Sequence, residues 1–137
     1  MFEGALTAVL DAGHVARFVA GGDSMYPAIR DGDTVLVEPC MEDSLRIGEV
    51  VLSKAPRGLT AHRIVGIRHR QDAVEIVTRG DNCLRRDPPL VSTSHLGRVV
   101  GVERNGREMR LFDESLTLFR LSRSTFIYWR AILRRLR

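Results

Sequence analysis

Apolar side chains change their spacing twice along this chain of 137 residues. A short helix is predicted for residues 2–12, because the apolar residues of this segment fall roughly on one side of a helix. These residues are Phe2, Leu6, Val9 and Leu10. From Val15 onward, short β-like runs alternate with turn residues. The predicted strands cover residues 15–20, 34–39, 49–54, 59–68, 74–78, 98–104 and 108–112.

Turn residues separate these runs. Gly21-Gly22 follows the first run, Asp31-Gly32-Asp33 leads into the second, and Gly80-Asp81 follows the fifth. Asn105-Gly106 lies between the last two runs and is the strongest short signal for a β-hairpin. Because no helical pattern stands between the runs, they predict a mainly β domain with antiparallel strands over residues 1–113.

The segment from 114 to 137 has a different pattern, with apolar residues near helical spacing and arginines between them. It is predicted to form a basic amphipathic helix. Three roles for residues 115–137 are open: packing on the β domain, binding to a membrane surface, or docking to a peptide or a membrane-anchored partner protein. The apolar residues are Leu118, Phe119, Phe126, Trp129, Ile132, Leu133 and Leu136.

The net charge of +4 does not indicate a nucleic-acid partner. Residues 115–137 hold six arginines and no acid, so the rest of the chain carries +4 − 6 = −2. A nucleic-acid-binding domain normally has its basic face on the folded body, and we expect none here. The N-terminal segment lacks a basic region and is too short to cross a bilayer, which predicts a cytoplasmic protein.

Metal and disulfide chemistry are not expected. Cys40 and Cys83 are too few for a disulfide framework and are interpreted as free thiols. The histidines lack the spacing of metal ligands, so neither a metal nor another cofactor is predicted. They are His14, His62, His69 and His95.

The glycine-rich segment GGDSMYPAIRDGD is the most informative part of the chain, since it holds Ser24 in a sharp turn. Pro27 fixes its own φ angle and restricts Tyr26, which stiffens the loop after the serine. Glycines in such a turn let the backbone approach a substrate closely and leave N–H groups free for an oxyanion. On its own, however, this segment is more typical of an ordinary turn than of a catalytic site.

A serine hydroxyl needs a base to act as a nucleophile, and His62 in the strand TAHRIVGI is the best candidate. Asp81 and Asp87 follow in TRGDNCLRRDPPL, and either carboxylate is able to orient the imidazole. Both aspartates are also common turn residues. A histidine base predicts activity that rises through neutral pH.

Taken together, five segments resemble the type I signal peptidases, in the same order and over roughly residues 15–104. GDSMYP resembles the nucleophile box of that family, RIGEVVLSKAP the strand that follows it, and AHRIVGI the general-base box. RGDNCLRRD resembles the last box, and LGRVVG the strand that closes the site. The resemblance implies the LexA/signal-peptidase β fold and a serine endopeptidase.

A histidine at the base position resembles the archaeal and endoplasmic-reticulum branch of the family, which has Ser, His and Asp where bacterial enzymes have a Ser–Lys dyad. Lys54 is the only lysine, and it stands in an earlier strand. By resemblance, Gly22, Met25 and Pro27 are expected to contact an extended peptide with small residues at the scissile bond. Some relatives have an oxyanion-binding serine where this chain has Gly22.

The resulting hypothesis is an endopeptidase that cleaves a signal or leader peptide, with Ser24, His62 and Asp81 or Asp87 at its centre. Relatives usually carry a transmembrane anchor before the nucleophile box, and no such segment stands before Ser24 here. The enzyme is therefore expected in the cytoplasm or at the surface of a membrane. Two alternatives remain: a self-cleaving LexA-like protein, and a non-catalytic peptide-binding or assembly module on the same fold.

Overall fold

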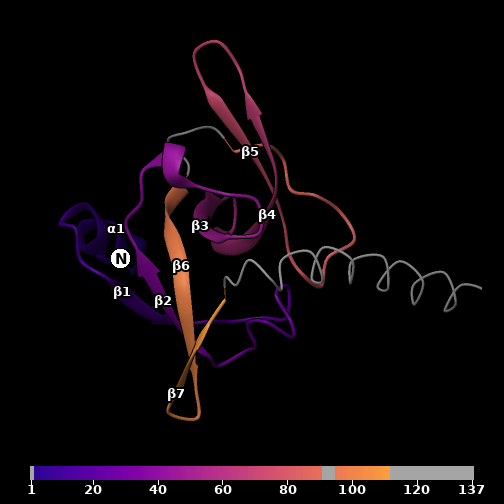
Figure 1. Ribbon diagram of the computed structural model, residues 1–137. Helices are drawn as coiled ribbons and strands as arrows, with labels where there is room; N and C mark the ends of the chain where they lie inside the picture. Colours follow the sequence, from indigo (N-terminus) through magenta and orange to yellow (C-terminus); the bar gives the residue numbers. More distant parts are fainter. Residues whose placement is uncertain (1, 91–94, 112–137) are drawn as a thin grey trace, which may run out of the picture.

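The computed structural model describes residues 2–90 and 95–111 (Figure 1). It confirms the predicted fold class, a mainly antiparallel β structure with one short N-terminal helix. The predicted helix over 114–137 lies outside the described residues. In chain order the elements are α1 (Phe2–Asp11), β1 (Ala16–Val19), β2 (Thr34–Glu38), the 3₁₀ turn η1 (Glu42–Ser44), β3 (Val50–Ala55), β4 (Gly58–His69), β5 (Val74–Arg79), β6 (His95–Arg104) and β7 (Arg107–Arg110).

The described strands form one seven-stranded sheet in which every pairing is antiparallel. The order is β1-β2-β6-β3-β4-β5, and β7 also pairs with β6. Figure 1 shows β6 along the middle of the molecule, with α1, β1 and β2 to one side and β3, β4 and β5 to the other. Strands from the two halves of the sequence are therefore neighbours, which brings the loop after β1 toward the strands after β3.

The hydrophobic core lies on both faces of β3. Val50 and Leu52 point into the larger cluster of buried side chains, while Val51 points into a smaller one, because successive residues of a strand face opposite sides. Leu6 and Leu10 attach α1 to the larger cluster. That cluster also contains two residues of the loop between β1 and β2, Met25 and Ile29.

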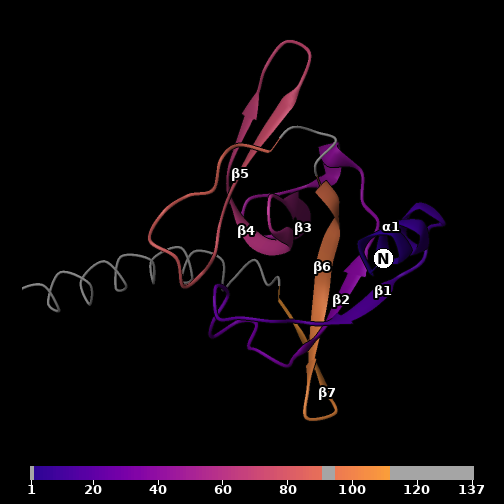
Figure 2. The ribbon, with the colours of Figure 1, turned by 180° about the vertical axis from the view of Figure 1, so that it is seen from behind.

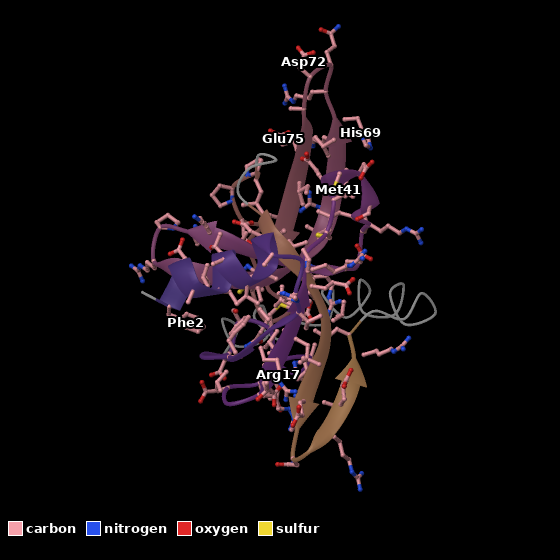
Figure 3. The ribbon with its side chains drawn as sticks, turned by 90° about the vertical axis from the view of Figure 1, so that its left-hand side faces the viewer. Phe2, Arg17, Met41, His69, Asp72 and Glu75 are labelled. Carbon is pink, nitrogen blue, oxygen red and sulfur yellow. The ribbon has the colours of Figure 1, made fainter. Side chains whose placement is uncertain are left out.

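Two of the hairpins, β4–β5 and β6–β7, extend toward opposite ends of the molecule, as Figure 2 shows. In Figure 3, His69 and Asp72 lie toward the tip of β4–β5, and Phe2 lies on α1. The β6–β7 turn is Asn105-Gly106, with φ angles of 52° and 73°. Positive φ at both positions is the type I′ geometry that the Asn-Gly pair favours, as predicted.

The loop that leads into β2 is held by a buried ion pair. Asp33 is almost fully buried, and its two oxygens accept hydrogen bonds from Arg104 Nε and Nη2 at 2.8 and 2.6 Å. The backbone N–H of Arg30 donates to the same carboxylate at 2.7 Å. The hydrogen bond from Arg104 is the main reason that the pKa of Asp33 lies below its ordinary value.

Asp33→Asn is expected to lower the urea midpoint at pH 7, because the amide keeps the shape but loses the charge that Arg104 binds. A pKa that is lower in the folded protein stabilises the fold above the unfolded pKa of about 3.9, and the effect is lost as the pH falls further. The difference between wild type and variant should therefore close below about pH 4. A difference that stays constant from pH 7 to pH 3 would contradict this account.

Candidate active site

Ser24 lies in the loop between β1 and β2, on a turn that is anchored in the core. The carbonyl of Asp23 accepts the N–H of Tyr26 at 3.1 Å, which closes the turn. Met25 is only 4% exposed and packs in the larger core cluster, whereas Ser24 itself is exposed. The peptide bond from Tyr26 to Pro27 is cis. The buried methionine fixes the turn, so the neighbouring serine is presented at the surface.

The structure brings Ser24, His62 and Asp87 into one hydrogen-bonded row. Ser24 Oγ lies 3.1 Å from His62 Nε2, and His62 Nδ1 lies 2.6 Å from Asp87 Oδ2. His62 is mostly buried in β4 and lies directly opposite Val51 on the neighbouring strand β3. A carboxylate only accepts hydrogen bonds, so Nδ1 carries the hydrogen and Nε2 is left to accept the proton of the serine hydroxyl. This is the arrangement that activates a serine nucleophile.

Asp87 owes its position to the strand before it. Its backbone N–H donates to the carbonyl of Thr78 at 2.8 Å, and the Thr78 hydroxyl donates to Asp87 Oδ2 at 2.7 Å. Thr78 is buried near the end of β5, which pairs with β4 next to His62. Two donors, Thr78 and His62, therefore meet the same carboxylate oxygen and fix its position.

Asp81, the other aspartate predicted to orient His62, has a different partner. Its two oxygens accept hydrogen bonds from Arg63 Nε and Nη2, both at 2.7 Å. Arg63 is only 4% exposed and also donates to the carbonyl of Gly48 at 2.7 Å. Adjacent residues of β4 point to opposite faces of the sheet, so the carboxylate that binds Arg63 does not reach His62. Of the two aspartates predicted as alternatives, the structure brings Asp87 to His62 and places Asp81 against Arg63.

The residues predicted to contact substrate have different environments. Pro27 is exposed, and its contact with substrate stays a prediction. Met25 is buried, so its side chain supports the turn and has little surface left for a ligand. The N–H of Gly22 donates to Asp31 Oδ1 at 2.9 Å and is not available to an oxyanion. Within the described part of the chain, the N–H groups of Ser24 and Met25 have no acceptor.

The turn after β5 is hydrogen-bonded to the turn that carries Ser24, a contact that the sequence did not reveal. In both Figure 1 and Figure 2, the segment that follows β5 passes the loop between β1 and β2. The N–H of Asn82 donates to the carbonyl of Ser24 at 2.8 Å, and Asn82 Nδ2 donates to the carbonyl of Asp23 at 3.1 Å. The sequence signals were the turn composition of Gly80-Asp81-Asn82 and the resemblance of RGDNCLRRD to a family box, and neither says what the turn faces.

Cys83 lies beside the nucleophile but is poorly suited to compete with it. Its thiol is 3.8 Å from the carbonyl oxygen of Ser24 and donates weakly to it. Burial raises the pKa of the Cys83 thiol, and the charge of Asp87 raises it further. A thiol with a raised pKa stays protonated and unreactive at neutral pH. The pKa of Cys40 is likewise raised by burial, and both cysteines are free.

Lys54, the alternative base, lies elsewhere. It stands on β3 opposite Leu59, and its ammonium nitrogen is 3.4 Å from Glu3 Oε1 on α1. The nitrogen that lies within hydrogen-bond reach of Ser24 Oγ is His62 Nε2. The geometry therefore favours a histidine base over a Ser–Lys dyad.

Gly80 leaves no room for a side chain beside the nucleophile. A Cβ atom at this position would lie 2.5 Å from the carbonyl oxygen of Ser24, 2.6 Å from Cys83 Sγ and 3.1 Å from His62 Nε2. Gly80→Ala is expected to push the serine away from the imidazole and to lower the rate of reaction at Ser24 by about 100-fold, the cost of a displacement of roughly 1 Å. The measurement is kcat/KM on a cleavable peptide.

Gly66→Ala is the matched control, because it changes another glycine of the same region without a clash. Its Cβ would meet the Cβ of Val77 at 3.7 Å, an ordinary contact. This variant should keep the wild-type activity. Equal activity of Gly80→Ala and Gly66→Ala would show that the turn after β5 does not set the position of Ser24.

In the ranges 2–90 and 95–111, no helix is long and apolar enough to cross a membrane. Within the same ranges, no three acidic, histidine or cysteine residues are grouped so that they could hold a metal ion.

Comparison with known proteins yields one family match. The model of a family described as Peptidase S24-like matches residues 5–100, which is more than half of the chain and includes Ser24, His62 and Asp87. No curated protein matches the sequence.

Proposed function

Because this chain belongs to the Peptidase S24-like family, we propose that it is a serine endopeptidase of the signal-peptidase type. The single observation that carries the proposal is the row of Ser24, His62 and Asp87, with contacts of 3.1 and 2.6 Å. Each of these groups has the partner that acyl transfer requires: a hydroxyl, a base, and a carboxylate behind the base.

In the proposed reaction, Ser24 Oγ attacks the carbonyl carbon of the scissile peptide bond while its proton passes to His62 Nε2. The C–N bond then breaks, and the imidazolium returns the proton to the leaving amine. Water then attacks the acyl carbon while His62 takes its proton. The ester bond to Ser24 Oγ breaks, the acid leaves, and the imidazolium returns the proton to the serine. Asp87 keeps the imidazole in the tautomer that accepts the proton, and it stabilises the imidazolium.

The oxyanion of the tetrahedral intermediate needs hydrogen-bond donors next to the nucleophile. The backbone N–H groups of Ser24 and Met25 fit this role, because both lack an acceptor among the described residues. The N–H of Gly22 is bound to Asp31 and is left out. Backbone donors of this kind also account for a site that lacks the oxyanion-binding serine of some relatives.

The finer assignment is the Ser-His-Asp branch, acting on a signal or leader peptide. The contact of His62 with Ser24 and the distant ion pair of Lys54 with Glu3 support this branch. An exposed serine on a fixed turn suits an extended peptide with small residues at the scissile bond. The preprotein or leader peptide would be met in the cytoplasm or at a membrane surface, where residues 115–137 would contact the lipid or an anchored partner.

Covalent labelling tests the proposal without knowledge of the natural substrate. Native protein is treated with a fluorophosphonate, and mass spectrometry locates the adduct. The expected result is a single adduct on Ser24 that is absent from heat-denatured protein and from Ser24→Ala. A folded protein whose Ser24 stays unmodified would instead indicate a peptide-binding or assembly module. Cleavage of the chain itself during incubation would indicate the self-cleaving, LexA-like alternative.

A further inference from the structure

Two successive peptide groups of the nucleophile turn are held by one residue. The carbonyl of Asp23 accepts a hydrogen bond from Asn82 Nδ2 at 3.1 Å, and the carbonyl of Ser24 accepts one from the backbone N–H of Asn82 at 2.8 Å. The side chain and the backbone of Asn82 therefore fix the planes of the peptide groups on either side of Ser24.

These peptide groups carry the proposed oxyanion donors at their other ends. The carbonyl of Asp23 shares a peptide plane with the N–H of Ser24, and the carbonyl of Ser24 shares one with the N–H of Met25. The cis bond described in this turn joins Tyr26 to Pro27, so both of these peptide groups are trans. In a trans peptide the C=O and N–H bonds point in opposite directions. A hydrogen bond from Asn82 to each carbonyl therefore directs the N–H of the same peptide group away from Asn82.

We propose that Asn82 is a positioning residue for the oxyanion site, which it aims by holding the carbonyls of Asp23 and Ser24. The inference rests on the proposed peptidase function and adds a residue to it. Asn82 is exposed and belongs to neither core cluster, so core packing does not explain why an asparagine stands at this position. Its side-chain amide does meet a carbonyl one peptide bond from the nucleophile.

Other groups also hold these two carbonyls, and this limits how much the labelling rate should fall when the Asn82 side chain is changed. The carbonyl of Asp23 also accepts the N–H of Tyr26 at 3.1 Å, and the carbonyl of Ser24 also lies 3.8 Å from the Cys83 thiol. Loss of the Asn82 amide therefore loosens the turn without dissolving it. Loss of a whole oxyanion donor costs about 100- to 1000-fold in rate, and a misdirected donor is expected to cost about 10- to 100-fold.

The test compares the rates at which a fluorophosphonate modifies Ser24. In this step Ser24 Oγ forms a bond to phosphorus, the P–F bond breaks, fluoride leaves, and the serine proton passes to His62. The phosphoryl oxygen occupies the oxyanion site, so the maximal rate of labelling reports on that site. Asn82→Ala and Asn82→Asp should both lower the maximal rate, while the probe concentration at half-maximal rate and the thermal midpoint stay near the wild-type values.

The relative labelling rates of the two variants distinguish a residue that positions the turn from one that only fills space. Asn82→Asp preserves the size of the side chain but places a carboxylate oxygen against the carbonyl oxygen of Asp23, so it should be slower than Asn82→Ala. A residue that only fills space would give the opposite order. Asn105→Asp makes the same chemical change in the β6–β7 turn and should label at the wild-type rate.

Each outcome bears on a different claim. Wild-type rates for Asn82→Asp, or an aspartate variant that labels faster than the alanine variant, would overturn the role of Asn82 and leave the peptidase proposal standing. A native wild-type protein that does not label at all would overturn the proposed function, and the role of Asn82 with it.

Discussion

Ser24→Ala is expected to reduce kcat for peptide cleavage by about 10⁵- to 10⁶-fold, because the variant has no nucleophile to form the acyl-enzyme. The hydroxyl makes one described side-chain contact, with His62 Nε2 at 3.1 Å, and the residue is exposed. Its loss should therefore leave the thermal midpoint close to that of the wild type. The measurement uses a quenched fluorescent peptide with alanine on both sides of the scissile bond.

Ser44→Ala is the matched control for this experiment. Its hydroxyl donates to the carbonyl of Met41 within the short turn η1, away from the site. This variant carries the same chemical change and should cleave the peptide at the wild-type rate. Retention of substantial cleavage by Ser24→Ala, in protein shown to be free of contaminating peptidase, would reject the acyl-transfer mechanism.

Asp87→Asn is expected to lower kcat by about 10⁴-fold with a small effect on KM, as loss of the carboxylate does in other Ser-His-Asp enzymes. The carboxylate accepts the hydrogen of His62 Nδ1 at 2.6 Å and leaves Nε2 free to receive the serine proton. An asparagine is able to turn its NH₂ group toward Nδ1, which places the hydrogen on Nε2 instead. That tautomer cannot take a proton from Ser24.

Asp81→Asn makes the same change six residues away and should behave differently. Its carboxylate binds Arg63, which is buried, so the variant leaves a buried guanidinium with only part of its partner. Loss of a partner from a buried ion pair costs about 3 kcal/mol or more, so the main effect is expected in urea unfolding. A larger fall in kcat for Asp81→Asn than for Asp87→Asn would contradict the assignment of Asp87 to His62.

The strand pattern and the nucleophile turn were predictable because their signals are local. Short β-like runs bounded by turn residues predicted strands at 49–54 and 74–78, where β3 and β5 lie, since a short apolar run shows in a few neighbouring residues. The pair Asn105-Gly106 predicted the β6–β7 turn, because these two residues themselves favour the positive φ angles that the turn requires. The ordered boxes around Ser24 and His62 likewise indicated which side chains to consider.

Which of Asp81 and Asp87 contacts His62 could not be predicted from neighbouring residues. Both aspartates follow β5 in one turn-rich segment, and either was able to meet an imidazole. His62 and Arg63 are adjacent in β4 and therefore point to opposite faces. The pairing of β4 with β5 then brings Asp87 to one of them and Asp81 to the other. Pairings of this kind join residues distant in sequence, so no short window of the chain contains them.

The sequence by itself determined the mainly β class and the short first helix, because periodicity and turn chemistry are read from neighbouring residues. Its resemblance to a known family pointed to Ser24 and His62 as the side chains to consider. Only the tertiary structure decided that Met25 is a core anchor, that Gly22 is bound to Asp31, and that the turn at Asn82 closes on Ser24. Burial and contacts of this kind depend on the whole fold, in which β6 joins the two halves of the sheet.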